Sequence, residues 1–477
     1  SSEGKGVVRP QEGVLQQCQW PYSHNLTSPK FYCFKLNNFS VHHSPEPSTE
    51  SCQVTVINRT IVSSKTDEFQ MNGFESGDQY GASLLPLSGG GFAIVYGNHF
   101  SSTDSLALTI FSADGEPVET ESGAYTLPYS GSALGVQMYG EPLIAENSDG
   151  SILLRWISDN SSWQDKVLMT ASVSSDGAIE RPQSLVSNTL FFGNAALAVG
   201  ANGQQHTILQ DEVFESLYLN VKTQDGSHLN IFSVASGFVN YQNVDIAALS
   251  DGKMLIAATE VSDNGTNPIH LQFRQSSGLS EGAFFVIDPV GPSDDDEEIE
   301  LAALPGEGFA LAYASTYENG TGVTLRIFDD LDNNPDGITV RADSNFAATE
   351  SDVEVTALPN GWVVVSWTSE SDGQSDVYVR IYDQKGTAKS DALLVSNGQT
   401  DAVDPSLAAL TDGSLVVSWT DSRGDSDGDA IRGTILEIVN RATGDAGNNQ
   451  LNGSDIADVL KGVSLLLTIA VIVLLAR

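Results

Sequence analysis

Residues 357–367 read ALPNGWVVVSW, and a closely similar stretch, ALTDGSLVVSW, follows fifty-two residues later at 409–419. Each copy has an apolar segment ending in Ala-Leu, a turn closed by glycine, and a second segment rich in Val and Trp. An Asn-Gly or Asp-Gly pair between two β-rich segments is the strongest short-range signal of a β-hairpin. The recurrence of this hairpin predicts a chain built from like units.

The rest of the unit can be read from the residues that follow Trp367. A polar turn leads to a third predicted strand at 377–382, and a turn ending at Gly386 leads to a fourth at 392–395. The unit is therefore a four-stranded meander of about fifty residues, which is the length of a propeller blade.

More divergent copies of the hairpin precede these two, and their turns lie at residues 87–91, 147–150, 201–203, 249–252 and 304–308. Seven hairpins result, but the seventh unit stops after its third strand at 431–438. Residues 60–63 resemble 393–396, so we expect an N-terminal strand to complete the last blade. The predicted fold is all-β, a closed seven-bladed β-propeller of four-stranded blades; an open stack or two sandwiches are the alternatives.

The propeller accounts for most of the chain, and the remaining segments differ from it in composition. We divide the chain into a Cys-containing N-terminal arm or cap, the propeller, a Gly- and Asn-rich linker and an apolar tail, at residues 1–52, 53–440, 441–462 and 463–477.

The charge is strongly acidic, with 62 Asp and Glu against 22 Lys and Arg, a formal net charge of -40. Nucleic acid is excluded as a partner, because its phosphates require Lys and Arg. Such a surface suits a protein of a salty, calcium-containing extracellular medium.

The N-terminal segment contains all three cysteines, Cys18, Cys33 and Cys52. Three cysteines allow one disulfide and one free thiol, and the sequence does not determine which two pair. The segment is either a small cap on the propeller or an arm that reaches another copy of the chain. No apolar stretch opens the chain, so we expect that any secretion signal has been removed or was never included.

Seven Asn-x-Ser/Thr sequons occur, and chance alone would give roughly five in a chain of this composition. Three of them fall between the second and third strands of a unit, where a glycan could project. We predict glycosylation, if the chain follows a eukaryotic secretory route, at Asn25, Asn38, Asn58, Asn160, Asn264 and Asn319.

One turn of the fifth unit resembles half of a calcium loop, with oxygen ligands at alternate positions before Gly337. The predicted ligands are Asp330, Asp332, Asn334 and Asp336, and the alternative is a solvated acidic turn. Asp343 stands where a twelfth-position acid would, but the intervening strand would carry it out of reach.

Three other acids repeat at one position, four residues before the Leu of their hairpins: Asp245, Glu300 and Glu354. They are expected near one face of the ring, as a site for a cation or a basic partner or as ordinary surface acids.

No catalytic motif is evident, and no catalytic residue is predicted. The seven histidines are scattered, the propeller contains no cysteine, and Gly-x-Ser-x-Gly and phosphate-loop motifs are missing. A glycosidase or lyase with two carboxylates is still an alternative, because 62 acids would hide such a pair.

The repeated pattern ALxDGxxVVSW followed by YVRIYDxxG and LVSN resembles the propeller-type repeats of large secreted bacterial surface proteins, which often end in RTX calcium repeats. The resemblance covers about residues 60–438, and residues 447–462 resemble one or two degenerate RTX turns. It implies a surface or adhesive protein.

The chain departs from that family at residues 463–476, VSLLLTIAVIVLLA, which as a helix would span about 21 Å against a hydrocarbon layer of about 30 Å. This tail is an anchor or sorting signal, a helix buried in an assembly, or a short membrane segment.

We therefore expect a non-enzymatic surface or structural glycoprotein outside the cell, acting as an adhesion module or scaffold. Its partners would be other copies of itself, surface glycans or proteins, and a membrane reached through the tail. The alternative is a carbohydrate-active enzyme with paired carboxylates at the mouth of the propeller.

Overall fold

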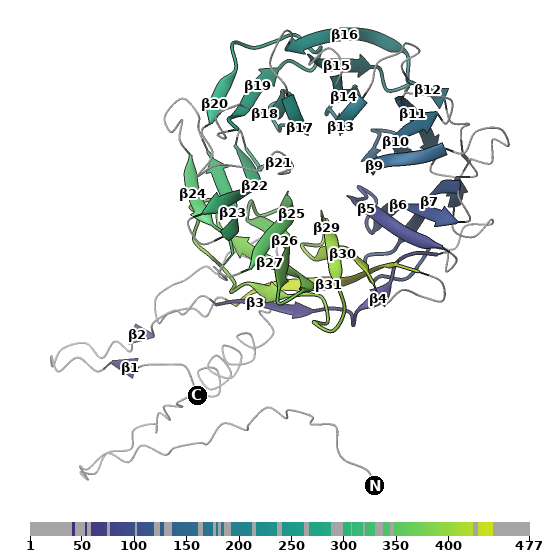
Figure 1. Cartoon of the computed structure of the whole chain (residues 1–477). Coiled ribbons are helices and arrows are strands. Elements are labelled where there is room, and N and C mark those ends of the chain that lie inside the picture. The colour runs from purple at the N-terminus through teal and green to yellow at the C-terminus, as the bar shows by residue number, and fades with distance from the viewer. Residues whose placement is uncertain are drawn as a thin grey trace, which may run out of the picture. The chain divides into compact units, whose positions relative to one another are not determined.

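The computed structural model is an all-β ring of seven antiparallel sheets (Figure 1). It describes residues 41–42, 53–54, 59–73, 77–100, 103–118, 125–127, 136–160, 166–174, 178–179, 183–185, 192–211, 216–235, 241–261, 267–287, 299–306, 308–317, 320–329, 337–343, 348–422 and 428–441. The compact unit that holds the ring runs over Thr60–Val439. A separate unit contains the two-stranded sheet of β1 (Val41–His42) and β2 (Gln53–Val54).

Six blades follow one another along the chain, each with its first strand innermost. Blades 1 to 3 are β5–β8 (Asp78–Pro86, Phe92–Phe100, Thr103–Phe111, Tyr125–Leu127), β9–β12 (Val136–Glu146, Ile152–Asn160, Lys166–Val173, Gln183–Ser184) and β13–β16 (Phe192–Val199, Gln205–Asp211, Ser216–Lys222, His228–Ala235). Blades 4 to 6 are β17–β20 (Tyr241–Ala248, Met254–Glu260, Ile269–Arg274, Phe285–Ile287), β21–β24 (Ile299–Ala303, Phe309–Tyr317, Gly320–Phe328, Ile338–Arg341) and β25–β28 (Thr349–Ala357, Val363–Ser371, Gln374–Tyr382, Leu393–Leu394).

Blade 7 combines the two ends of the propeller. Its strands are β29 (Ala402–Ala409), β30 (Leu415–Asp421), β31 (Ala430–Arg441) and the N-terminal β3 (Arg59–Ser64). The predicted closure is confirmed, and the first strands of neighbouring blades touch around the whole circle, including β29 against β5. A second N-terminal strand that we did not predict, β4 (Phe69–Gln70), also pairs with β31.

The repeated hairpin forms as its sequence indicates. Gly361 and Gly413 take left-handed conformations, with φ of +80° and +85°, that close the turns between first and second strands. Trp367 and Trp419, at the ends of the two copies, are 2% and 0% exposed.

The hydrophobic core is divided into clusters between facing blades. In β26, Val363 and Val365 pack in the cluster shared with blade 5, whereas Val364 packs in the cluster shared with blade 7. Both faces of β26 are apolar for this reason, because the blade is covered by a neighbour on both sides.

Among the described residues, no helix has the length and apolar character of a membrane span. The predicted linker at 442–462 and the tail at 463–477 lie outside the described residues, as do all three cysteines.

We predict that Gly433→Ala weakens ring closure. Gly433 pairs with Phe69 of β4, and a Cβ at this position would meet the Met71 side chain and the Val417 carbonyl oxygen. Because Met71 is 1% exposed, the clash with the added Cβ can be relieved only by a backbone shift. We therefore expect a loss of about 1–3 kcal/mol in the free energy of unfolding, measured by urea denaturation.

The matched control is Gly89→Ala, because an added Cβ at Gly89 meets no atom within 4 Å. Equal unfolding free energies for the two variants would contradict the proposed tight fit of β31 against the N-terminal strands.

Candidate active site

The seven first strands contribute one equivalent residue each to the centre of the ring. This residue stands three places before the end of its strand, and all seven copies line one central cavity of about 350 Å³: Ser83, Leu143, Ala196, Asp245, Glu300, Glu354 and Ser406. The acids that recur in the sequence at this position are therefore brought together in the cavity.

A second tier lies two residues earlier, where most first strands contain a β-bulge. Register shifts in blades 4, 6 and 7 accompany left-handed φ angles of +47° at Asn243, +48° at Asp352 and +52° at Asp404. A bulge redirects the side chain beside it, and bulges of this kind are common next to active sites. All three of these residues line the cavity.

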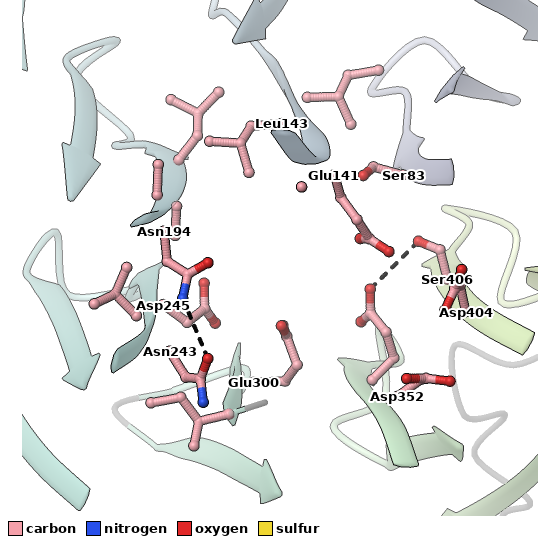
Figure 2. A pocket seen from close by; sticks show the side chains of 18 of the residues that line it. Ser83, Glu141, Leu143, Asn194, Asn243, Asp245, Glu300, Asp352, Asp404 and Ser406 are labelled. Atoms are coloured by element: carbon pink, nitrogen blue, oxygen red, sulfur yellow. Dashed lines mark hydrogen bonds between the residues drawn. The ribbon is translucent and has the colours of Figure 1, made fainter. Parts of the chain in front are cut away.

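The cavity is strongly acidic. Six carboxylates line it, and its lining, as far as the structure describes it, contains no Lys, Arg or His: Glu141, Asp245, Glu300, Asp352, Glu354 and Asp404. Figure 2 shows the carboxyl groups of Glu141 and Glu300 directed toward the open centre, with Asp352 and Asp404 on one side and Asp245 on the other.

Asp245 joins two blades. Its Oδ1 accepts a hydrogen bond from Ile246 N at 2.6 Å, and its Oδ2 accepts one from Leu301 N of blade 5 at 2.7 Å. Burial raises the pKa of Asp245 to about 6, although these two bonds favour the charged form.

Asp352 and Asp404 form an electrostatic pair on neighbouring blades. Burial, and then the negative charge of Asp352, raises the pKa of Asp404 to about 6. Ser351 Oγ donates to Asp352 Oδ2 at 3.3 Å. A carboxyl group with a raised pKa beside a second carboxyl group is an arrangement that acid and base catalysis uses.

Hydrogen bonds between blades fix this side of the cavity. Ser406 Oγ donates to Glu354 Oε1 of blade 6 at 3.4 Å and accepts from Leu84 N of blade 1 at 3.1 Å. Ser83 Oγ donates to Pro142 O of blade 2 at 2.6 Å. The carboxylates therefore stand on a framework that depends on the closed ring.

The predicted calcium loop falls between β23 and β24 in the sequence, and its predicted ligands lie outside the described residues: Asp330, Asp332, Asn334 and Asp336. Asp343 has another role: it accepts bonds from Arg341 and from Val323 N at 2.9 Å. In the described part of the chain, no three His, Cys, Asp or Glu residues are placed to hold a metal ion.

Of the predicted glycosylation sites, Asn160 is the last residue of β10. The other five lie outside the described residues: Asn25, Asn38, Asn58, Asn264 and Asn319.

Sequence reasoning missed Glu141, Asp352 and Asp404 as candidate site residues. A signal for two of them was present, since Asp352 and Asp404 are fifty-two residues apart, the same spacing as the repeated hairpin. A search for acids at any repeated position of the first strands, and not only at the position four residues before Leu, would have found both Asp352 and Asp404.

Comparison with known proteins identifies relatives in fold. No family model matches the sequence, and no curated protein does. An ulvan lyase of polysaccharide lyase family PL25, solved with -[GlcA(1-4)Rha3S]- bound, is 8% identical with a TM-score of 0.50, over 76% of this chain and 95% of that one.

A GH93 α-L-arabinofuranosidase of Fusarium graminearum is 14% identical with a TM-score of 0.45, over 78% of this chain and 97% of that one. The NanB sialidase from Streptococcus pneumoniae is 10% identical with a TM-score of 0.40, over 78% of this chain and 70% of that one. At these identities the likeness shows the fold alone.

These findings correct our prediction of a non-enzymatic adhesion or scaffold module. The ulvan lyase, whose TM-score is 0.50, is a polysaccharide-cleaving enzyme, which agrees with the alternative of a carbohydrate-active enzyme. The error arose because the acids of the cavity come from different blades, far apart in the sequence.

We predict that Asp404 makes stability depend on pH. Its pKa is about 6 in the folded protein and near 4 in an unfolded chain, so the folded state binds more protons between these values. Stability is therefore lost as the pH rises from about 4 to about 6. Relative to Asp404→Asn, the wild type should lose on the order of 1–3 kcal/mol over this range, measured by denaturant titration at each pH.

Asp372→Asn is the matched control, because Asp372 is also left-handed (φ of +54°) but lies in an exposed turn. The difference in unfolding free energy between wild type and Asp404→Asn should change with pH. The corresponding difference between wild type and Asp372→Asn should not. A pH-independent difference for Asp404→Asn would show that its carboxyl titrates normally.

Proposed function

We propose that this protein is a glycoside hydrolase that cleaves a neutral glycan in the central cavity. The proposal depends above all on the Asp352–Asp404 pair, two carboxyl groups that stand on bulges of adjacent blades, line one cavity and interact electrostatically. Glycosidases use such pairs, one protonated and one ionised.

Asp404 is the proposed general acid. Its raised pKa keeps the proton at mildly acidic pH, so its O–H can donate to the glycosidic oxygen as the bond to the anomeric carbon breaks. The ionised Asp352 then either removes a proton from an attacking water or attacks the anomeric carbon itself. In the second case, a water hydrolyses the intermediate with Asp404 acting as the base.

The charge of the cavity supports a neutral substrate. A uronate, sulfate or sialate group would be repelled by the ionised carboxylates of the cavity and would find no cationic side chain in the described lining. Neutral sugar hydroxyls, by contrast, can donate to Glu141, Asp245 and Glu300. A lyase reaction on uronates is disfavoured for the same reason, because the sugar carboxylate would have no neutralising partner.

The amide pair opposite the acids can contribute to sugar binding. Asn194 Nδ2 donates to Asn243 Oδ1 at 3.3 Å across blades 3 and 4, and both residues line the cavity (Figure 2). Amides offer both donors and acceptors, which suits sugar hydroxyl groups.

We also propose that the protein acts outside the cell. Support comes from the acidic surface, with its formal charge of -40, and from a glycan substrate of the kind found in cell walls and extracellular matrices.

We predict that Asp404→Asn and Asp352→Asn each lower kcat/KM by about 10²–10⁴-fold, because each removes one proton-transfer or nucleophilic partner. The assay measures sugar release from neutral polysaccharides and 4-nitrophenyl glycosides, with polygalacturonate and sialyllactose as anionic comparisons. Asp372→Asn, on the exposed turn, should retain wild-type activity.

The two roles can be separated with a leaving group that needs no protonation. A 2,4-dinitrophenyl glycoside should restore activity to Asp404→Asn and not to Asp352→Asn. Hydrolysis confined to the anionic substrates, or unchanged activity in both variants, would contradict the proposal.

We further predict that kcat/KM falls above a pH of about 6, since Asp404 must be protonated to donate. The pH profile of the wild type, measured on an unactivated glycoside, should show this descending limb. The pH profile of Asp404→Asn, measured with the dinitrophenyl substrate, should lack this descending limb. A wild-type profile that continues to rise to pH 8 would refute the assignment of Asp404 as the acid.

A further inference from the structure

The contact between blades 2 and 3 buries a cationic side chain whose hydrogen-bond donors are largely without acceptors. Arg155 of β10 is 1% exposed, and the apolar cluster at this contact consists of Ile157, Leu168, Leu185 and Leu209. The other contacts between blades have larger apolar clusters, such as the one between blades 5 and 6. In Figure 1, β10 faces β14 and β15 across this contact.

The guanidinium of Arg155 has a single hydrogen bond in the structure, from Nη2 to Gln205 Oε1 of β14 at 2.8 Å. Its Nε and Nη1 atoms are buried without an acceptor. A buried charge is costly unless it is paired, and no carboxylate of the described residues is bonded to this one. Burial accordingly lowers the pKa of Arg155 to about 9.

Other unsatisfied donors gather on the facing strands. Thr207 and Asn220 are directly paired across β14 and β15, both are fully buried, and the Thr207 hydroxyl and the Asn220 amide have no hydrogen-bond partner. The next pair toward the turn is Gln205 with Lys222. Burial and the charge of Arg155 lower the pKa of Lys222, so the two cations are close enough to interact.

The arrangement therefore contains a guanidinium, a hydroxyl, an amide and, at its edge, an ammonium group. All of them can donate hydrogen bonds, and two carry positive charge. A water molecule could satisfy some of these donors but would leave the charge of Arg155 uncompensated. A small anion would do both.

We propose that the contact between blades 2 and 3 is a binding site for a monovalent inorganic anion of the size of chloride, held by Arg155, Thr207 and Asn220 with Lys222 at the edge. The site is separate from the central cavity, and it holds two blades together where the apolar core is thin. It is independent of the proposed hydrolase activity.

Chloride dependence of thermal stability tests the proposal on the whole protein. The protein is first measured in sodium gluconate, and gluconate is then replaced stepwise with chloride at constant ionic strength. The Tm should rise by a few degrees and reach a plateau, and bromide should have the same effect. Arg155→Met should abolish this dependence.

Arg274→Met is the matched control. Arg274 is also buried, at 4% exposure, but its Nε donates to Gln272 Oε1 at 2.8 Å and its Nη1 to Gly278 O at 3.0 Å. This variant should retain the chloride response, even if its Tm is lower. A response that is lacking in the wild type, or that persists in Arg155→Met, would overturn the proposal.

A second measurement covers the case in which Arg155→Met does not fold. Crystals of the wild-type protein grown with bromide should show an anomalous peak beside the Arg155 guanidinium. Water or no density at that position would overturn the site.

Discussion

The pairing of the N-terminal strands with β31 is the constraint on which the rest of the structure depends. Lys65 N donates to Ile435 O at 2.7 Å and Met71 N donates to Ile431 O at 2.8 Å, so residues from opposite ends of the propeller share one sheet. This pairing removes the open edge of blade 7 and brings β29 against β5. Only a closed ring brings all seven first strands to one centre.

The crowding of carboxyl groups in the cavity disfavours folding, and the same crowding suits the cavity for acid and base chemistry. Six carboxylates share one space, and two of them, Asp352 and Asp404, stand on left-handed backbone at bulges. Conformational strain and like charges of this kind persist where the surrounding structure holds them, and they concentrate at functional sites. Here the blades supply that support, through Ser406 between blades 7, 6 and 1 and through Asp245 between blades 4 and 5.

Much of the fold could be predicted because its signals are local. The Asn-Gly and Asp-Gly turns give Gly361 and Gly413 their left-handed conformations, and the alternating apolar residues of β26 reflect a blade covered on both faces. Closure could also be predicted, from the likeness of residues 60–63 to 393–396. β4 was missed because two residues carry too little periodicity to be recognised as a strand.

The site was harder to predict because it is assembled from single residues of many blades. Asp245, Glu300 and Glu354 were recognised as one repeated position, but the sequence gives no sign that a first strand faces a cavity instead of solvent. The bulge at Asp352 is a property of pairing with β26, and the raised pKa of Asp404 depends on burial and on a neighbour in another blade. Neither is encoded in the local pattern.

A crystal structure of the Asp404→Asn protein with a bound neutral oligosaccharide tests most directly whether the acidic cavity is the catalytic centre. We expect a glycosidic oxygen within hydrogen-bond reach of the residue 404 side chain, and the adjoining anomeric carbon facing Asp352. A sugar bound on the outer strands, with the cavity holding only water, would contradict this assignment.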